Sequence, residues 1–250
     1  MINTLKILKH QGKQFIKDVA KVVLEEPFRG RPVISGKQVN ENEFIKVCPV
    51  GAITSNPPQI DLAKCTFCSE CAIKFPDKIK FTTDYKISTN DLSSLIIKEG
   101  IDETIKLNPD LIRNEISSFF HDSLKLRQVS AAGDNSAELE LNAAGNVNFD
   151  IGRFGIEFVA SPRHADGIVI TGPISENMAK PLQICYDAVP DPKIIILYGV
   201  DAISGGIFAG APTLNRVFLN KYKIDLYVPG NPPHPLTFIN GVLDLIKQRK

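Results

Sequence analysis

The sequence lacks the segments that would carry a chain into or across a membrane. Its 250 residues contain no apolar run of about 18 residues, and the N-terminus has no signal-peptide pattern. The net charge is also close to zero, since the sequence has 29 Lys and Arg residues and 28 Asp and Glu residues. From these absences we expect no membrane-spanning helix, no export and no nucleic-acid partner.

Motifs for independent catalysis are missing as well. The chain has four His residues and no Ser-His-Asp or Cys-His nucleophile pattern. The glycines around Gly205, Gly206 and Gly210 are not followed by Gly-Lys-Ser/Thr, so a P-loop has neither its lysine nor its hydroxyl. With 43% apolar residues, the chain can still form one large core or two modest cores. We expect a protein that is not catalytic alone.

Cysteine is infrequent but clustered. Three of the five cysteines form a C-x-x-C-x-x-C run at Cys65, Cys68 and Cys71, and Cys48-Pro49 lies upstream. Three thiolates on one tight loop and a fourth from a remote Cys-Pro suit a cubane iron-sulfur cluster. A zinc site, which prefers separated ligand pairs, and disulfides are the alternatives. Thiolate ligands indicate a reducing compartment, so we expect the cytoplasm. Cys185 fits a helical core pattern instead.

The cysteine segment resembles a two-cluster bacterial ferredoxin that keeps one site. In such ferredoxins the last Cys of each C-x-x-C-x-x-C-x-x-x-C-P run ligates the cluster of the other run. The lost ligands all belong to one site, and their positions hold Gln38, Glu41, Phe44 and Phe75. The other site is complete in Cys48, Cys65, Cys68 and Cys71. The resemblance implies a small α+β ferredoxin-like domain at residues 28–87 with one 4Fe-4S cluster bound by these four cysteines.

The second half of the chain has the pattern of an open α/β sheet. Short β-branched runs that are nearly continuous in apolar residues alternate with helical segments, as in buried parallel strands joined by crossover helices. The predicted strands are 154–159, 167–170, 194–198 and 224–228, and the predicted helices are 176–189 and 235–249. We expect a flavodoxin-like open parallel sheet in a domain at 131–250, with its working loops at the carboxyl ends of the strands.

Two further segments complete the predicted organisation. Residues 88–130 are expected to form a mostly helical connector, with Asn108 as an N-cap before Pro109. Residues 1–27 are expected to form a basic amphipathic helix, because five lysines and an apolar stripe occur in residues 1–24. Such a helix can lie on a membrane surface or a membrane subunit, or it can pack on its own domain.

The loops of the second domain carry a resemblance of their own. The motifs are Arg153-Phe154-Gly155, Ser161-Pro162-Arg163-His164, Thr171-Gly172-Pro173, Ser204-Gly205-Gly206 and Tyr227-Val228-Pro229-Gly230. As an ordered set they resemble the small electron-transfer subunit shared by complex I and nickel-iron hydrogenases of the formate hydrogenlyase type. The segment Phe28-Arg29-Gly30-Arg31-Pro32 is similar to the ferredoxin-like subunit of the same complexes. The chain thus resembles a fusion of two neighbouring subunits.

The small subunit of that family binds a 4Fe-4S cluster of its own through four cysteines. In this chain the corresponding positions hold Asp134, Ala137, Asp201 and Asn231. Because these side chains cannot replace four thiolates, we expect no cluster in the second domain. The side-chain oxygen atoms of Asp134, Asp201 and Asn231 could instead face a hard cation such as magnesium or calcium, or could simply be solvated or hydrogen-bonded.

The resemblance implies an electron-transfer subunit of a membrane-associated oxidoreductase complex related to NADH-quinone oxidoreductase and energy-converting nickel-iron hydrogenase. The implied partners are a large-subunit homologue and membrane subunits, with the protein peripheral on the inner face of the cell membrane. A structural or docking subunit with a redox-inactive α/β domain is the alternative. The electron donor and acceptor are left open.

Overall fold

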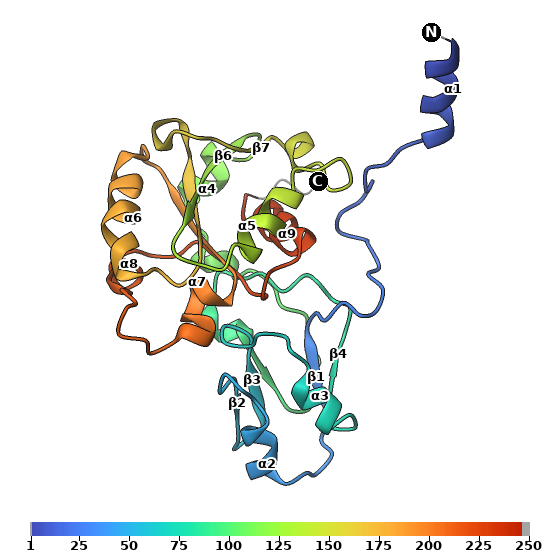
Figure 1. The fold of residues 1–250 in the computed structure, drawn as a ribbon, viewed down its shortest axis with the longest axis vertical. Coiled ribbons are helices and arrows are strands. Elements are labelled where there is room, and N and C mark those ends of the chain that lie inside the picture. The colour runs from blue at the N-terminus through green and yellow to red at the C-terminus, as the bar shows by residue number, and fades with distance from the viewer. Residues whose placement is uncertain (1, 247–250) are drawn as a thin grey trace.

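The structure is a computed structural model that describes residues 2–246. A larger α/β unit and a smaller unit, whose strands and helices lie between Pro32 and Lys98, follow one another along the long axis, and the N-terminal helix projects away from both (Figure 1). None of the helices in the described part of the chain has the length and apolar content needed to cross a bilayer.

The larger unit contains a five-stranded parallel sheet. Its strands are β6 (Leu124–Ser130), β7 (Ile156–Phe158), β8 (Gly167–Thr171), β9 (Ile194–Tyr198) and β10 (Leu226–Val228). They lie in the order β7-β6-β8-β9-β10, and every adjacent pair is parallel. This is the doubly wound order of flavodoxin-like sheets. The expected open parallel α/β sheet is therefore confirmed, and β8 and β9 are fully buried as their apolar runs predict.

Helices cover both faces of this sheet (Figure 1). The longer ones are α5 (Ser136–Ala143), α6 (Glu176–Ala188) and α9 (Pro235–Leu245), and the shorter ones are α7 (Val200–Ser204) and α8 (Val217–Lys221). Alternate residues of β9 face opposite sides. Ile195 and Leu197 share a core with α6 and α8, whereas Ile194 and Ile196 share one with α5 and α9. The predicted helices are confirmed except for 247–249, which lie outside the described residues.

The smaller unit has the element order β-α-β-β-α-β. Its elements are β1 (Pro32–Ile34), α2 (Glu41–Lys46), β2 (Ile53–Thr54), β3 (Gln59–Asp61), α3 (Glu70–Lys74) and β4 (Ile79–Phe81). The outer strands β1 and β4 pair antiparallel, as do the inner strands β2 and β3. A later strand, β5 (Ile96–Lys98), joins β3. The two helices each lie beside part of the cysteine set.

The N-terminal helix is shorter than the sequence pattern predicts. Helix α1 spans Ile2–Gln11 and ends before Gly12, which takes the left-handed conformation (φ +62°) that glycine adopts without strain. The chain then runs over the body, where Val19 is 4% exposed. The carbonyl oxygen of Val19 accepts hydrogen bonds from Tyr85 Oη (2.7 Å) and Asn240 Nδ2 (2.9 Å). These contacts favour an extended strap where a helical stripe was expected.

The segment 88–130 also differs from the mostly helical connector that was expected. It contains short helical turns, η1 (Leu92–Leu95), η2 (Pro109–Leu111) and α4 (Asn114–Phe119), and two strands, β5 and β6. The Asn108 side chain does accept from the Asp110 amide at the start of η2, as predicted for an N-cap. Strand β6 escaped prediction because its polar residues interrupt the apolar run, although it pairs with both β7 and β8.

Candidate metal centre

The four cysteines expected as ligands line one cavity in the smaller unit. Cys48 comes from the loop after α2, Cys65 and Cys68 from the loop before α3, and Cys71 from α3 itself. The rest of the wall is mainly apolar and includes Pro49, Val50, Ala52, Ile53, Ile60 and Phe81. The structure therefore brings together side chains that are up to 23 positions apart in the sequence.

Backbone amide groups donate hydrogen bonds to two of the cysteine sulfurs. Phe67 (φ 55°) and Ser69 (φ 67°) both take the left-handed conformation, which folds the C-x-x-C-x-x-C run into a tight turn. The Phe67 amide donates to Cys65 Sγ at 3.4 Å, and the Ala52 amide donates to Cys48 Sγ at 3.2 Å. Hydrogen bonds to sulfur stabilise thiolates and help set the potential of an iron-sulfur cluster.

Burial makes the thiols of Cys65 and Cys71 poor acids on their own. Cys65 and Cys71 are each 8% exposed, Cys48 is half-buried and Cys68 is exposed. Desolvation raises the pKa of Cys65 to about 12 and that of Cys71 to about 11, and the neighbouring thiols add to both increases. Thiolates here therefore require a positive charge between them, which a bound metal core supplies.

The donor set fits a cluster better than a single ion. Among residues 2–246, no three His, Cys, Asp or Glu side chains are placed to hold one metal ion between them. A zinc ion needs its sulfur ligands about 2.3 Å from one point. A cubane instead binds each of its four thiolates at a different corner, so four sulfurs around an apolar cavity suit it. Occupancy by such a cluster stays a prediction.

Two of the four positions assigned to the lost ferredoxin site come together. The rings of Phe44 and Phe75 meet edge to face, with centroids 5.5 Å apart and an interplanar angle of 86°. Phe44 is 1% exposed, while Gln38 and Glu41 are exposed. An apolar contact thus fills the space between α2 and α3, where the resemblance places the second set of ligands.

The positions of the missing second-domain cysteines lie in loops and in the first turns of helices that follow the carboxyl ends of the sheet strands. Asp134 precedes α5 and Asp201 lies in α7. Burial raises the pKa of Asp201, and the charges of Asp134 and Glu138 add to the increase, so these carboxylates lie close enough to interact. The Asp134 carboxylate accepts from the Ser136 amide (2.9 Å) and hydroxyl (2.6 Å), which lowers its pKa. The Oδ1 atom of Asp134 is thus already hydrogen-bonded within its own loop.

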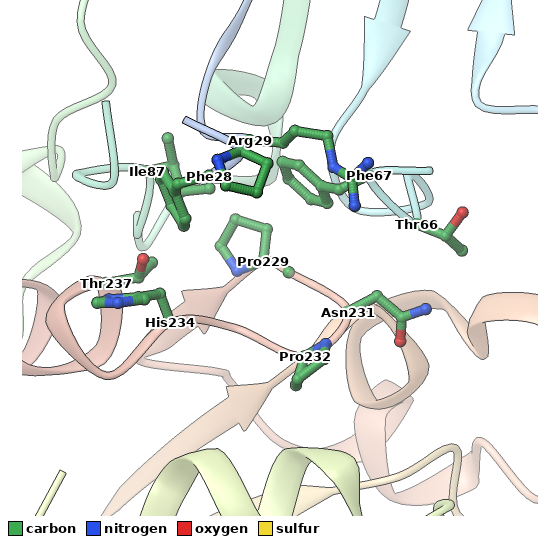
Figure 2. Close-up of a pocket in the computed structure, with 12 residues that line it drawn as sticks. Phe28, Arg29, Thr66, Phe67, Ile87, Pro229, Asn231, Pro232, His234 and Thr237 are labelled. Carbon is green, nitrogen blue, oxygen red and sulfur yellow. The ribbon is translucent and has the colours of Figure 1, made fainter. Parts of the chain in front are cut away.

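Asn231 faces the smaller unit across an interdomain cavity. It lines one cavity with Cys68 and Thr66. A second cavity of about 190 Å³ places Asn231, Pro229 and His234 opposite Phe28, Arg29 and Phe67 (Figure 2). The cysteine loop is therefore adjacent to a position where the second domain has lost a ligand.

Phe28, Arg29 and His234, which lie on this interdomain face, had no predicted role. The Phe28 ring packs edge to face on His234 at 5.3 Å. The Arg29 Nη1 atom donates to Ser69 Oγ at 3.2 Å, beside the cysteines. The only sequence signal was the motif at 28–32, whose contacts depend on loops about 40 and 200 positions away.

Comparison with known proteins identifies relatives of the second domain. Residues 135–245 match the family described as NADH ubiquinone oxidoreductase, 20 Kd subunit. A probable membrane-bound hydrogenase subunit of Pyrococcus furiosus is 35% identical over 115 residues, which are 46% of this chain and 69% of that protein. A subunit of the NADH-quinone oxidoreductase of Clostridium beijerinckii is 42% identical over 108 residues, 43% of this chain and 64% of that protein.

A third relative extends over more of the chain. Formate hydrogenlyase subunit 7 of Escherichia coli is 32% identical over 166 residues, which are 65% of this chain and 64% of that protein. The chain thus spans about two thirds of the length of these relatives, and the family match lies entirely within the sheet domain. The chain therefore belongs to the family of the 20 Kd subunit of NADH ubiquinone oxidoreductase.

Proposed function

We propose that this protein is an electron-transfer subunit that carries one 4Fe-4S cluster, bound by Cys48, Cys65, Cys68 and Cys71. The observation that carries the proposal is the single cavity lined by all four cysteines. The β-α-β-β-α-β order, with its outer and inner strands paired, supports a ferredoxin-like unit at residues 28–87. The Phe44–Phe75 contact supports a domain that has kept one site of two.

The chain's own groups would set the properties of this centre. When bound, the cluster supplies one-electron chemistry. The amides of Ala52 and Phe67 hold two of the sulfurs by hydrogen bonds, and the wall of Ile53, Ile60 and Phe81 excludes water. Cys68 is the exposed cysteine of the four, so electrons would enter or leave at its corner of the site.

Anaerobic purification tests the proposal directly. We expect about four irons per chain and a reversible one-electron signal between about −700 and +450 mV. Iron analysis, electron paramagnetic resonance and potentiometric titration measure these quantities. Protein that folds with zinc or with no metal at these cysteines would contradict the assignment.

A structural role is the second candidate, and the missing cysteines of the sheet domain favour it. With Asp134, Ala137, Asp201 and Asn231 in their places, an onward cluster lacks its thiolates. The α/β domain would then dock to its partners while the cluster mainly holds the smaller unit together. A cluster that cannot be reduced without unfolding would support this candidate over electron transfer.

We further propose partners of the kind that its relatives' names describe. One relative is a membrane-bound hydrogenase subunit and another is a subunit of NADH-quinone oxidoreductase. By analogy, this chain would join a large-subunit homologue and membrane subunits, peripherally on the cytoplasmic face of the cell membrane. Anaerobic co-purification from its native source tests this assignment, and a chain that is isolated alone under mild conditions would contradict it.

Helix α1 supports a contact with an anionic membrane surface. It projects from the body (Figure 1), and Ile2, Leu5 and Leu8 are 71%, 61% and 58% exposed. Residues 2–17 contain four lysines and no Asp or Glu. The apolar residues therefore do not pack on the protein's own domain, and basic charge near anionic lipid contributes about 1 kcal/mol per lysine.

Vesicle binding measures the contribution of this helix. Replacing Lys6 and Lys9 by Glu should weaken binding to phosphatidylglycerol vesicles by at least about 2 kcal/mol, roughly 30-fold. Binding should also weaken with added salt. The same double change at Lys98 and Lys180, which are exposed on the body, is the control. If the two double variants weaken binding equally, vesicle binding depends on the overall charge of the protein, and a specific contribution of α1 is excluded.

A further inference from the structure

Arg29 is positioned by two fixed neighbours. The preceding ring, Phe28, lies against His234 of the sheet domain. The following residue, Gly30, donates its amide to Thr82 O at 2.7 Å, and it approaches Asp84 so closely that a Cβ atom there would collide with the Asp84 backbone. The segment 28–30 is thus held between the two units, and its middle side chain points along the interdomain cavity (Figure 2).

From this position the guanidinium reaches the cysteine loop. Arg29 Nη1 lies 3.2 Å from Ser69 Oγ and 3.5 Å from Cys68 O. Ser69 has left-handed backbone and follows Cys68 directly, so Arg29 contacts the loop at the corner of the site that is exposed to water. Figure 2 shows the guanidinium beside Phe67 and on the same side of the cavity as Thr66.

The charge of Arg29 differs from those of Lys64 and Lys74 near the loop in having neutral partners. Lys64 pairs with Asp61 at 3.5 Å, and Lys74 lies 4.0 Å from Glu43. Among the described residues, no ion pair joins Arg29 to a carboxylate. Within the described part of the chain, its positive charge is therefore not neutralised by a direct ion pair. Four thiolates make a cluster site negative, and each added electron makes it more so.

We infer that Arg29 is a positioning residue that sets the reduction potential of the centre. The inference rests on the proposed function, because it requires the cluster at the four cysteines. A fixed positive charge beside the site stabilises the reduced state more than the oxidised state and so raises the potential. Because the guanidinium is exposed, added salt screens part of this effect.

Potentiometric titration of the protein tests the inference with three variants. Arg29→Gln removes the charge, Arg29→Lys keeps it, and Lys98→Gln removes an exposed charge elsewhere on the same unit. We expect all three to retain about four irons per chain. Only Arg29→Gln should shift the midpoint potential to a more negative value, and the shift should shrink at high salt. Arg29→Lys should stay near the wild-type midpoint.

The outcomes separate this inference from the proposed function. Wild-type protein without a cluster overturns both. Wild-type protein with a cluster, and equal midpoints in Arg29→Gln and Lys98→Gln, overturns the role of Arg29 alone. If Arg29→Gln fails to hold the cluster, Arg29→Lys decides the matter. A cluster near the wild-type potential in the lysine variant supports the role of the charge, and a large negative shift there overturns it.

Discussion

Replacing Cys68 by Ser should remove the cluster, so that iron falls from about four atoms per chain to near zero. Serine occupies nearly the same volume as cysteine, and Cys68 is exposed, so the substitution itself disturbs little packing. The expected loss is chemical, because a hydroxyl is a poor ligand for iron at a site built from thiolates. Iron analysis and the visible absorption of the cluster measure the change.

The same variant should loosen the smaller unit. Metal-binding energy is folding energy where the site does not pre-exist in the unfolded chain, and Cys65 and Cys71 are themselves buried in the apolar core of the smaller unit. Hydrogen exchange at residues 28–87 should therefore accelerate, while exchange in β8 and β9 stays slow. Cys185→Ser is the matched control, because Cys185 lies half-buried on α6 and outside the cysteine cavity. Full iron retention in Cys68→Ser would refute the ligand assignment.

Replacing Phe44 by Ala should destabilise the smaller unit by about 3–5 kcal/mol, the usual cost of removing a buried ring. Phe44 is 1% exposed, and its ring packs against Phe75 at 5.5 Å. Truncation leaves a cavity between α2 and α3. No cluster ligands are present there to fill it, so the side chains that line the cavity lose their packing contacts. Native-state hydrogen exchange of the amides in β2 and β3 reports the loss of stability in this unit.

Phe119→Ala is the control for this variant. Phe119 is the same residue type at a position that is 65% exposed, so its removal should change stability by less than about 0.5 kcal/mol. A similarly small effect of Phe44→Ala would show that the Phe44–Phe75 contact is not part of a packed core. The proposal that this space replaces a lost cluster site would then lose its structural support.

Local sequence patterns predicted much of the sheet domain. Apolar β-branched runs identified β8 and β9, and the alternation with helices identified the open parallel sheet. Burial on both faces requires apolar residues at every position, so such strands are visible without any knowledge of their partners. Strand β6 was missed because its pattern is mixed, and only its pairing with β7 and β8 defines it.

Tertiary contacts decided the course of the N-terminal segment. Its lysines and apolar residues predicted one long helix, yet α1 ends at Gln11 and Val19 packs into the body. Helical periodicity shows only that a segment could bury one face if it formed a helix. It does not show that the segment forms one. The contacts of Val19 with Tyr85 and Asn240 come from residues 66 and 221 positions away, which no local window includes.

By itself, the sequence determined the number and type of the proposed ligands, and its resemblance to the small-subunit family implied that four cysteines are missing from the sheet domain. These are statements about residue identity, and the C-x-x-C-x-x-C spacing with the upstream Cys48-Pro49 pair carries the first of them. Only the tertiary structure decided that Cys48 shares a cavity with the other three, that Phe44 meets Phe75, and that Arg29 reaches Ser69. Side chains on separate loops meet only when the packing of the whole chain fixes both loops, so such contacts have no signature in the local sequence.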